Sequence, residues 1–222
     1  MAGLTTTPRR RIAVLASGRG SNLQALIDAC AQPEFPAEIV HVLSNVDGVM
    51  ALDRARQVGI PTSVVSHRGF SDREAFDAAV NEHLRGAGAE LVCLAGFMRI
   101  LSETFVETWR DRLINIHPSL LPAFKGLHTH ERVLTAGVRI TGCTVHFVRP
   151  AMDEGPIIVQ AAVPVHPDDT PDSLAERVLK AEHEIYPLAL SLVASGRARV
   201  VDELVEIDGF SLSPTHFFNP CA

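Results

Sequence analysis

Short apolar runs rich in β-branched residues alternate with segments of helical periodicity through the first half of the chain, a pattern typical of a parallel sheet covered by helices. The pattern predicts strands over residues 11–16, 38–44, 61–66, 91–95 and 113–117. It predicts helices over residues 21–30, 49–58, 72–86 and 104–111. Ser71 is expected as the N-cap of the third helix and Glu74 as its capping-box partner.

The second half has a different pattern. Two longer apolar runs, 140–148 and 156–165, are separated only by the loop 149–155, and so short a connection favours an antiparallel pair. A long helix follows, with Thr170 as N-cap and Pro171 at its first position, and a final strand is expected over 200–207. The two halves predict an α/β fold with a mostly parallel central sheet flanked by helices, a C-terminal antiparallel strand pair and a long helix.

Composition and charge exclude several classes of protein. The chain has 222 residues, 46% of them hydrophobic, which is enough for one domain with a full core. Its formal net charge is −6 and no basic run is longer than residues 9–11, so no nucleic-acid partner is expected. No apolar stretch reaches the roughly 20 residues of a membrane span, so no membrane association and a cytoplasmic location are expected. Four cysteines without paired or metal-type spacing are expected as reduced thiols: Cys30, Cys93, Cys143 and Cys221.

The segment 113–122 brings an amide and an imidazole to one place. Side chains two apart in a strand point the same way, so Asn115 and His117 share a face at the strand's end. Pro118 and Pro122 then end regular pairing, which predicts a rigid turn at the carboxyl edge of the sheet. Open α/β sheets usually bind their ligands at that edge.

This pair suits acyl-type transfer, because an amide N–H can donate to a developing oxyanion and an imidazole can move protons near neutral pH. A carboxylate is needed to hold the imidazole, and Asp153 and Glu154 are both candidates. No serine or cysteine lies in a nucleophile pattern, which favours direct attack by a substrate amine. Four histidines do not match a zinc spacing, so no metal is expected: His117, His128, His130 and His146.

The loop 17–22 joins the first predicted strand to the first helix and contains Gly18 and Gly20. Such a loop suits a phosphate, because free backbone N–H groups and the helix dipole favour an anion there. The full dinucleotide motif fails, since Leu23 stands in place of the third glycine, and a plain structural turn stays open as an alternative. Arg73, in the first turn of a later helix, could clamp the same phosphate.

Five motifs, in order, resemble the phosphoribosylglycinamide formyltransferases of purine biosynthesis. They are Gly20-Ser21-Asn22, AGFMRIL at 95–101, NIHPSLLP at 115–122, GLHTH at 126–130, and VHFV at 145–148 with Asp153. The resemblance runs from about residue 11 to about residue 196. It implies a Rossmann-like formyltransferase fold in a single domain, 1–222, with a phosphate-binding lobe (1–110), a catalytic and folate-binding lobe (111–210) and a tail (211–222).

The resemblance also implies a role for each site residue. Asn115 would stabilise the oxyanion, His117 would act as the charged acid, and Asp153 would stabilise the charged imidazole and relay protons. The substrate 5-phosphoribosylglycinamide would be held by Gly20, Ser21, Asn22, Arg73 and, at its amine, Glu182. The co-substrate 10-formyltetrahydrofolate would be bound by Met98, Arg99, Ile100, Leu101 and Asp153, without a metal.

Two rival readings stay open. A formyltetrahydrofolate hydrolase, in which water replaces the amine, is the nearest, and a hydrolase or a formyltransferase that acts on methionyl-tRNA would carry a further domain for which this chain has no room. A non-catalytic folate or nucleotide sensor is the other, although a sensor has no need of Asn115, His117 and Asp153. The chain is expected as a monomer or a homodimer, since Phe217 and Phe218 could cover its own surface or a partner's.

Overall fold

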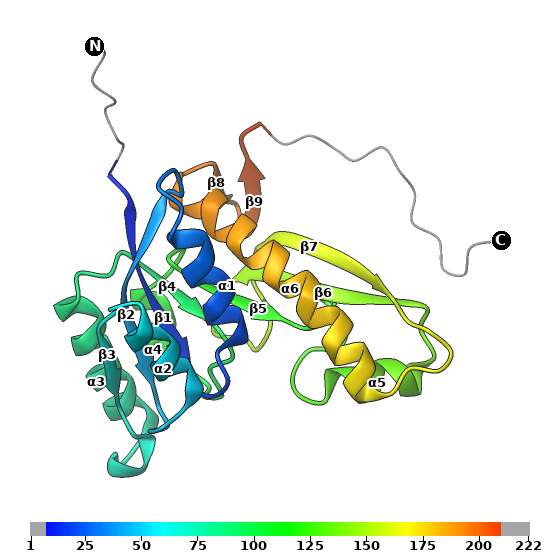
Figure 1. The fold of residues 1–222 in the computed structure, drawn as a ribbon, viewed down its shortest axis with the longest axis horizontal. Helices are drawn as coiled ribbons and strands as arrows, with labels where there is room; N and C mark the ends of the chain where they lie inside the picture. Colours follow the sequence, from blue (N-terminus) through cyan, green and yellow to red (C-terminus); the bar gives the residue numbers. More distant parts are fainter. Residues whose placement is uncertain (1–7, 210–222) are drawn as a thin grey trace.

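Nine strands and six α-helices make up residues 8–209, the part of the chain that this computed structural model describes (Figure 1). The strands are β1 (Arg10–Ala16), β2 (Ala37–Ser44), β3 (Thr62–Val64), β4 (Leu91–Leu94), β5 (Leu113–His117), β6 (Ile140–Phe147), β7 (Ile157–Pro164), β8 (Ala198–Val201) and β9 (Leu204–Ile207). The helices are α1 (Ser21–Cys30), α2 (Met50–Gln57), α3 (Arg73–Gly86), α4 (Glu103–Thr108), α5 (Thr129–Ala136) and α6 (Pro171–Ala194), with a 3-10 turn η1 (His67–Gly69).

Seven strands join in one sheet in the order β3-β2-β1-β4-β5-β6-β7. The first five are parallel, whereas β5 with β6 and β6 with β7 are antiparallel. The α/β fold predicted from the sequence is therefore confirmed, including the antiparallel pair. The sheet contains strands of both predicted lobes, and the division of the chain near residue 110 stays a prediction.

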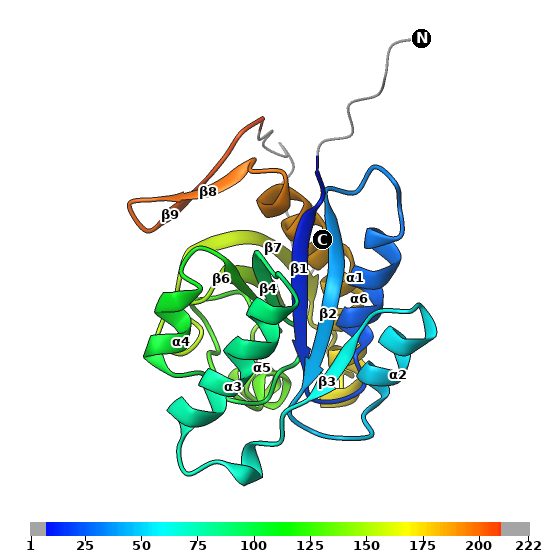
Figure 2. The ribbon, with the colours of Figure 1, turned by 90° about the vertical axis from the view of Figure 1, so that its left-hand side faces the viewer.

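Helices cover both faces of the sheet (Figure 2). On one face α1, α2 and α6 pack on alternate residues of the strands, and on the other face α3 and α4 do the same. Within β5, Ile114 and Ile116 belong to the first core and Leu113 to the second. Because side chains alternate along a strand, Asn115 and His117 share the face of Leu113.

Two local predictions are wrong, and one helix was not predicted. The N-cap of α3 is Asp72, whose carboxylate accepts a 2.8 Å hydrogen bond from the amide of Ala75, while Ser71 only donates to Asp72. The expected strand over 200–207 is a hairpin of β8 and β9, because the chain reverses at Asp202 and Glu203. The helix α5, with His128 as its N-cap, was not among the predicted helices.

The long helix α6 begins as predicted, with Thr170 as N-cap in a capping box and Pro171 in its first turn. Tyr186, which is completely buried, donates from its hydroxyl to the carbonyl of Leu94 at 3.0 Å and so ties α6 to the central strand β4. Over residues 8–209, no helix has both the length and the apolar character needed to cross a bilayer. Phe217, Phe218 and Cys221 lie outside the described residues.

Candidate active site

The carboxyl ends of β1, β4 and β5 lie at one edge of the sheet, and the loops that follow them contact one another. Ser17, after β1, donates its amide to the carbonyl of Gly96 at 3.1 Å, and its hydroxyl accepts a 2.8 Å hydrogen bond from the amide of Met98. In the next strand, Asn115 is paired in register with Leu94. The phosphate-loop candidate, the segment 95–101 and the Asn115–His117 pair are thus neighbours.

His117 is buried at the end of β5, with an acceptor beside each of its ring nitrogens. The Asp153 carboxylate lies 3.4 Å from Nδ1, and the carbonyl of Phe124 lies 3.0 Å from Nε2. Asp153 is in turn held by a 2.6 Å hydrogen bond from the amide of Gly126. Carboxylates and carbonyls only accept, so both ring nitrogens of His117 face acceptors. Of the two carboxylates considered, Asp153 is the one at His117, while Glu154 pairs with Lys125 at 2.6 Å.

Asn115 is held by a residue of the neighbouring strand. It lies opposite His146 in the β5–β6 register, and its Nδ2 is 3.3 Å from His146 Nε2. His146 Nδ1 is 2.9 Å from the carbonyl of Phe147 and so carries the ring proton, which leaves Nε2 to accept from the amide. Burial lowers the pKa of His146, in agreement with a neutral ring. The amide N–H₂ of Asn115 is thereby oriented as a donor.

The phosphate-loop candidate rests on α2. Gly20 has φ +70°, and a Cβ there would lie 2.7 Å from the Cα of Ala51. Ala51 donates its amide to the carbonyl of Gly18 at 3.1 Å, and Arg54 donates from Nε to the carbonyl of Arg19 at 3.0 Å. Glycine is therefore required at position 20 by both backbone conformation and space.

The amino terminus of α1 has no side-chain cap, because its N-cap is Gly20. The amides of the first helical turn are left for a ligand, as an anion site requires. Asn22, in that turn, donates from Nδ2 to the Glu182 carboxylate of α6 at 2.7 Å. Glu182 is only 7% exposed, and burial raises its pKa while the hydrogen bond from Asn22 opposes the shift. A phosphate-suited helix start and a buried carboxylate are thus directly joined.

The other predicted binding residues lie near this edge but are less constrained. Met98, Arg99 and Ile100 are exposed in the loop after β4, and Leu101 is buried in the core that contains α3 and α4. Arg73 is exposed at the first residue of α3. Among the described residues, no hydrogen bond or ion pair joins Arg73 to the loop 17–22, and its role as a phosphate clamp stays a prediction.

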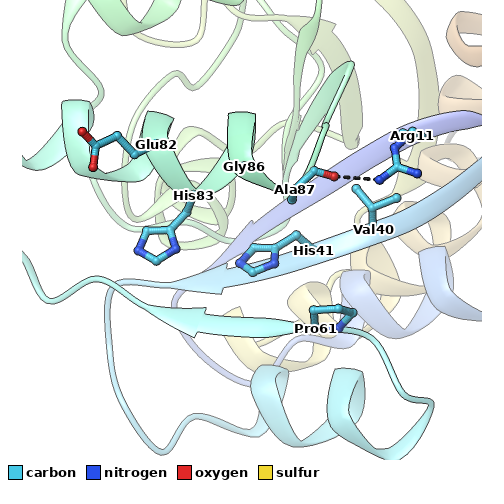
Figure 3. A pocket seen from close by; sticks show the side chains of 8 residues that line it. All are labelled: Arg11, Val40, His41, Pro61, Glu82, His83, Gly86 and Ala87. Carbon is cyan, nitrogen blue, oxygen red and sulfur yellow. Dashed lines mark hydrogen bonds between the residues drawn. The ribbon is translucent and has the colours of Figure 1, made fainter.

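Two cavities lie outside the Asn115–His117 pair. One, of about 400 Å³, adjoins the phosphate-loop candidate and is lined by Ser21, Gln24, Ala25, Asp28, Arg54 and His183. The other, of about 670 Å³, is at the opposite edge of the sheet, between the start of β1, the strand β2 and the end of α3 (Figure 3). It contains His41 and His83, whose rings stack with centroids 6.2 Å apart. Neither cavity is lined by the candidate catalytic residues.

Three of the cysteines are free and buried: Cys30, Cys93 and Cys143. Burial raises the pKa of Cys30 and of Cys143 to about 12, so neither is a nucleophile near neutral pH. Within residues 8–209, no three His, Cys, Asp or Glu side chains are grouped so that they could hold a metal ion.

Comparison with known proteins decides the family. Residues 10–190 match the formyl transferase family. The chain belongs to the formyl transferase family. This formyl transferase is 45% identical over 203 residues to the phosphoribosylglycinamide formyltransferase of Escherichia coli, with 91% of this chain and 96% of that protein covered.

A second relative is much longer. The formyl transferase is 56% identical over 192 residues to the trifunctional purine biosynthetic protein adenosine-3 of Bos taurus, and spans 86% of its own length but 19% of that protein. Among solved structures, glycinamide ribonucleotide transformylase 1 from Symbiobacterium toebii superposes with a TM-score of 0.87 at 45% identity, covering 90% of this chain and 94% of that one.

Some residues that shape the site in this formyl transferase were not predicted. His146 was named only among the histidines that do not match a zinc spacing and within the VHFV motif, without a role, and the carbonyl of Phe124 and the amide of Gly126 were not considered. Each acts through register or backbone position: His146 because it lies opposite Asn115, and Gly126 because the turn after β5 brings its amide to Asp153. The strand pattern would have placed His146 opposite Asn115 if the register of the two strands had been known. The contacts of backbone groups, in contrast, leave no signal in the sequence.

Proposed function

We propose that this chain transfers the formyl group of 10-formyltetrahydrofolate to the amine of 5-phosphoribosylglycinamide, a step of purine biosynthesis. Its similarity over nearly the full length of the Escherichia coli phosphoribosylglycinamide formyltransferase supports this reaction. So does the grouping of an anion-suited helix start, a buried carboxylate and an amide–imidazole–carboxylate set along one sheet edge.

In this proposal the ribonucleotide phosphate binds the uncapped start of α1 at Gly20, Ser21 and Asn22, with Arg73 as a further cation. The Glu182 carboxylate receives the glycinamide amine. The folate ring system lies along residues 98–101, so that the formyl carbon faces Asn115 and His117. Both substrates are then held in the geometry of attack, which converts a bimolecular reaction into one within the complex.

The chemistry needs no covalent enzyme intermediate. The amine nitrogen attacks the formyl carbon and forms a C–N bond, and the formyl oxygen becomes an oxyanion that Asn115 and protonated His117 stabilise. The bond from the formyl carbon to N10 of the folate then breaks. The amine loses one proton and N10 gains one, with Asp153 stabilising the imidazolium and relaying protons. The products are the formylated amide and tetrahydrofolate.

The observation that carries the proposal is the 2.7 Å hydrogen bond from Asn22 to Glu182. It links the phosphate-suited loop to a buried carboxylate that can receive an amine, so the two ends of a phosphorylated amine would bind along a connected surface. A hydrolase, which uses water, needs neither the phosphate loop nor this carboxylate. The connection therefore favours transfer over hydrolysis.

The test is a spectrophotometric assay of the deformylation of 10-formyltetrahydrofolate with and without glycinamide ribonucleotide. Release that requires the ribonucleotide is expected. Release without it would replace the transferase with a hydrolase, and folate binding without any release would favour a sensor. Asn115→Ala removes the amide that donates to the oxyanion, and it is expected to lower turnover by roughly 10²–10³-fold.

A further inference from the structure

Arg149, the first residue of the loop 149–155, is buried although its guanidinium is charged, with only 9% of its surface exposed. Each of its three nitrogens has a partner. Nε donates to Glu203 at 2.7 Å, Nη2 donates to Asp111 at 2.7 Å, and Nη1 donates to the carbonyl of Val148 at 3.1 Å. A buried charge is tolerated only when it is paired and hydrogen-bonded in this way.

Both carboxylates come from turns with unusual backbone conformation. Asp111, between α4 and β5, has φ +56°, and Glu203, in the two-residue turn of the β8–β9 hairpin, has φ +59°. A hairpin turn with two left-handed residues prefers Asn-Gly, so Asp202-Glu203 is not the sequence that the turn itself favours. The hydrogen bond from Arg149 keeps the pKa of Glu203 below its usual value, so the carboxylate is ionised. The Glu203 side chain is therefore explained by its contacts with two arginines, Arg149 at one carboxylate oxygen and Arg110 at the other.

The loop that begins at Arg149 leads directly to the candidate catalytic carboxylate. Val148 donates its amide to the carbonyl of Leu113 at the start of β5, while Asp153 lies beside His117 at the end of the same strand. The loop thus runs along β5 between these two points. Its base closes through a 2.9 Å hydrogen bond from the amide of Phe147 to the carbonyl of Pro156.

We propose that Arg149 is a positioning residue, which fixes Asp153 beside His117 by anchoring the start of the loop 149–155 to Asp111 and to Glu203 of the C-terminal hairpin. The hairpin is then a support of the active site, although its sequence carries no motif. The catalytic part of this inference rests on the proposed formyl transfer, and the anchor itself does not.

The physical argument concerns the Asp153 contact. The carboxylate is 3.4 Å from His117 Nδ1, so a small displacement of the loop removes the interaction. Displacements of about 1 Å can reduce turnover by up to about 10²-fold when they misplace a catalytic group. Anchoring four residues upstream limits such displacements, because ionic contacts from two nitrogens of one planar guanidinium to two carboxylates fix its orientation as well as its distance.

The decisive variant is Glu203→Asn. Asparagine is tolerated in the left-handed region, so the turn keeps its conformation, but the shorter neutral side chain loses its contacts with Arg149 and with the exposed Arg110. The matched control is Glu206→Gln on the same hairpin, where the side chain pairs with the exposed Arg199. Arg149→Gln and the double variant complete the set.

Two readouts are measured on the full chain. Hydrogen–deuterium exchange is expected to become faster over residues 149–155 in Glu203→Asn, with no change over residues 17–22. The kcat for ribonucleotide-dependent formyl transfer, measured well below the Tm of each variant, is expected to fall on the order of tenfold and its pH profile to shift. Glu206→Gln should match the wild type. If the two residues act through one contact, the double variant loses no more activity than Arg149→Gln.

The outcomes separate the anchor from the function. Unchanged exchange over residues 149–155 in Glu203→Asn would overturn the anchor, and faster exchange with wild-type kcat and pH profile would overturn its link to Asp153. A wild type without ribonucleotide-dependent turnover would instead refute the proposed function, and the exchange comparison would still decide the anchor. Should Arg149→Gln not fold, Glu203→Asn remains decisive, because Glu203 is 56% exposed and lies at a turn.

Discussion

One oxygen of Asp153, Oδ2, lies 3.4 Å from His117 Nδ1 and also accepts a 2.6 Å hydrogen bond from the amide of Gly126. The carboxylate is therefore held by the backbone of the turn after β5 and does not depend on His117 for its position. Such an arrangement can stabilise the imidazolium without the carboxylate moving, as an acid catalyst requires.

Asp153→Asn removes the negative charge of this side chain while it keeps nearly the same size and shape. Asparagine fits the left-handed backbone at this position, where φ is +51°, and can keep the contact with Gly126. The imidazolium loses its counter-charge, so kcat is expected to fall by roughly 10²–10⁴-fold with ligand binding largely retained. Steady-state kinetics and folate titration measure both. The control is Glu154→Gln, the adjacent carboxylate that pairs with Lys125, and near-normal turnover in Asp153→Asn would remove Asp153 from the mechanism.

Glu182→Gln tests the proposed amine site. A charged hydrogen bond contributes about 1.5–3 kcal/mol, so kcat/KM for the ribonucleotide is expected to fall about ten- to a hundredfold. Because burial raises the pKa of Glu182, the wild type should lose ribonucleotide affinity at a less acidic pH than an exposed glutamate would allow. Glu184→Gln, two residues further along the same helix and exposed, should behave like the wild type. A Glu182→Gln enzyme with unchanged kcat/KM would show that the amine binds elsewhere.

The two glycines of the loop 17–22 should respond differently to alanine. At Gly20 an added Cβ would meet the backbone of Ala51 at 2.7 Å in a left-handed conformation, whereas at Gly18 nothing lies within 4 Å of it. Gly20→Ala is expected to reduce the free energy of unfolding by at least about 1–2 kcal/mol, the cost of the left-handed backbone alone. Gly18→Ala should have little effect. Urea unfolding compares the two, and equal stabilities would mean that α2 does not constrain the loop.

The sequence predicts the sheet well because the buried strands are short apolar runs. It also predicts the orientation of Asn115 and His117, since alternation along a strand is a local property. The cap of α3 was misplaced because Ser71 and Asp72 are adjacent and both can cap a helix. The β8–β9 hairpin was missed because Asp202-Glu203 lacks the usual glycine.

Contacts between distant segments could not be derived from the residues. Asn22 and Glu182 are 160 positions apart, and without the family resemblance Glu182 is an ordinary helix charge. The same holds for Arg149 and Glu203, 54 positions apart, for which neither pattern nor resemblance indicated a role. Such pairs depend on how helices and hairpins pack on the sheet, and single-sequence periodicity does not contain that information.

Acid should destabilise the fold through histidines that are buried in neutral form. Burial, and in His41 also the nearby His83, lowers the pKa of the ring below its ordinary value of 6.5 (Figure 3). A lowered pKa in the folded state means that the unfolded chain binds the proton more readily. The contribution of His41 is therefore fully present above pH 6.5 and is lost as the pH falls below that value through the folded-state pKa.

The urea midpoint is expected to drop between pH 7.5 and pH 5.5, and to drop less in His41→Gln. His128→Gln, at a side chain that is 76% exposed, is the control and should keep the wild-type drop. An equal drop in His41→Gln and the wild type would assign the acid sensitivity to other buried histidines, of which His146 has its pKa lowered by burial in the same way.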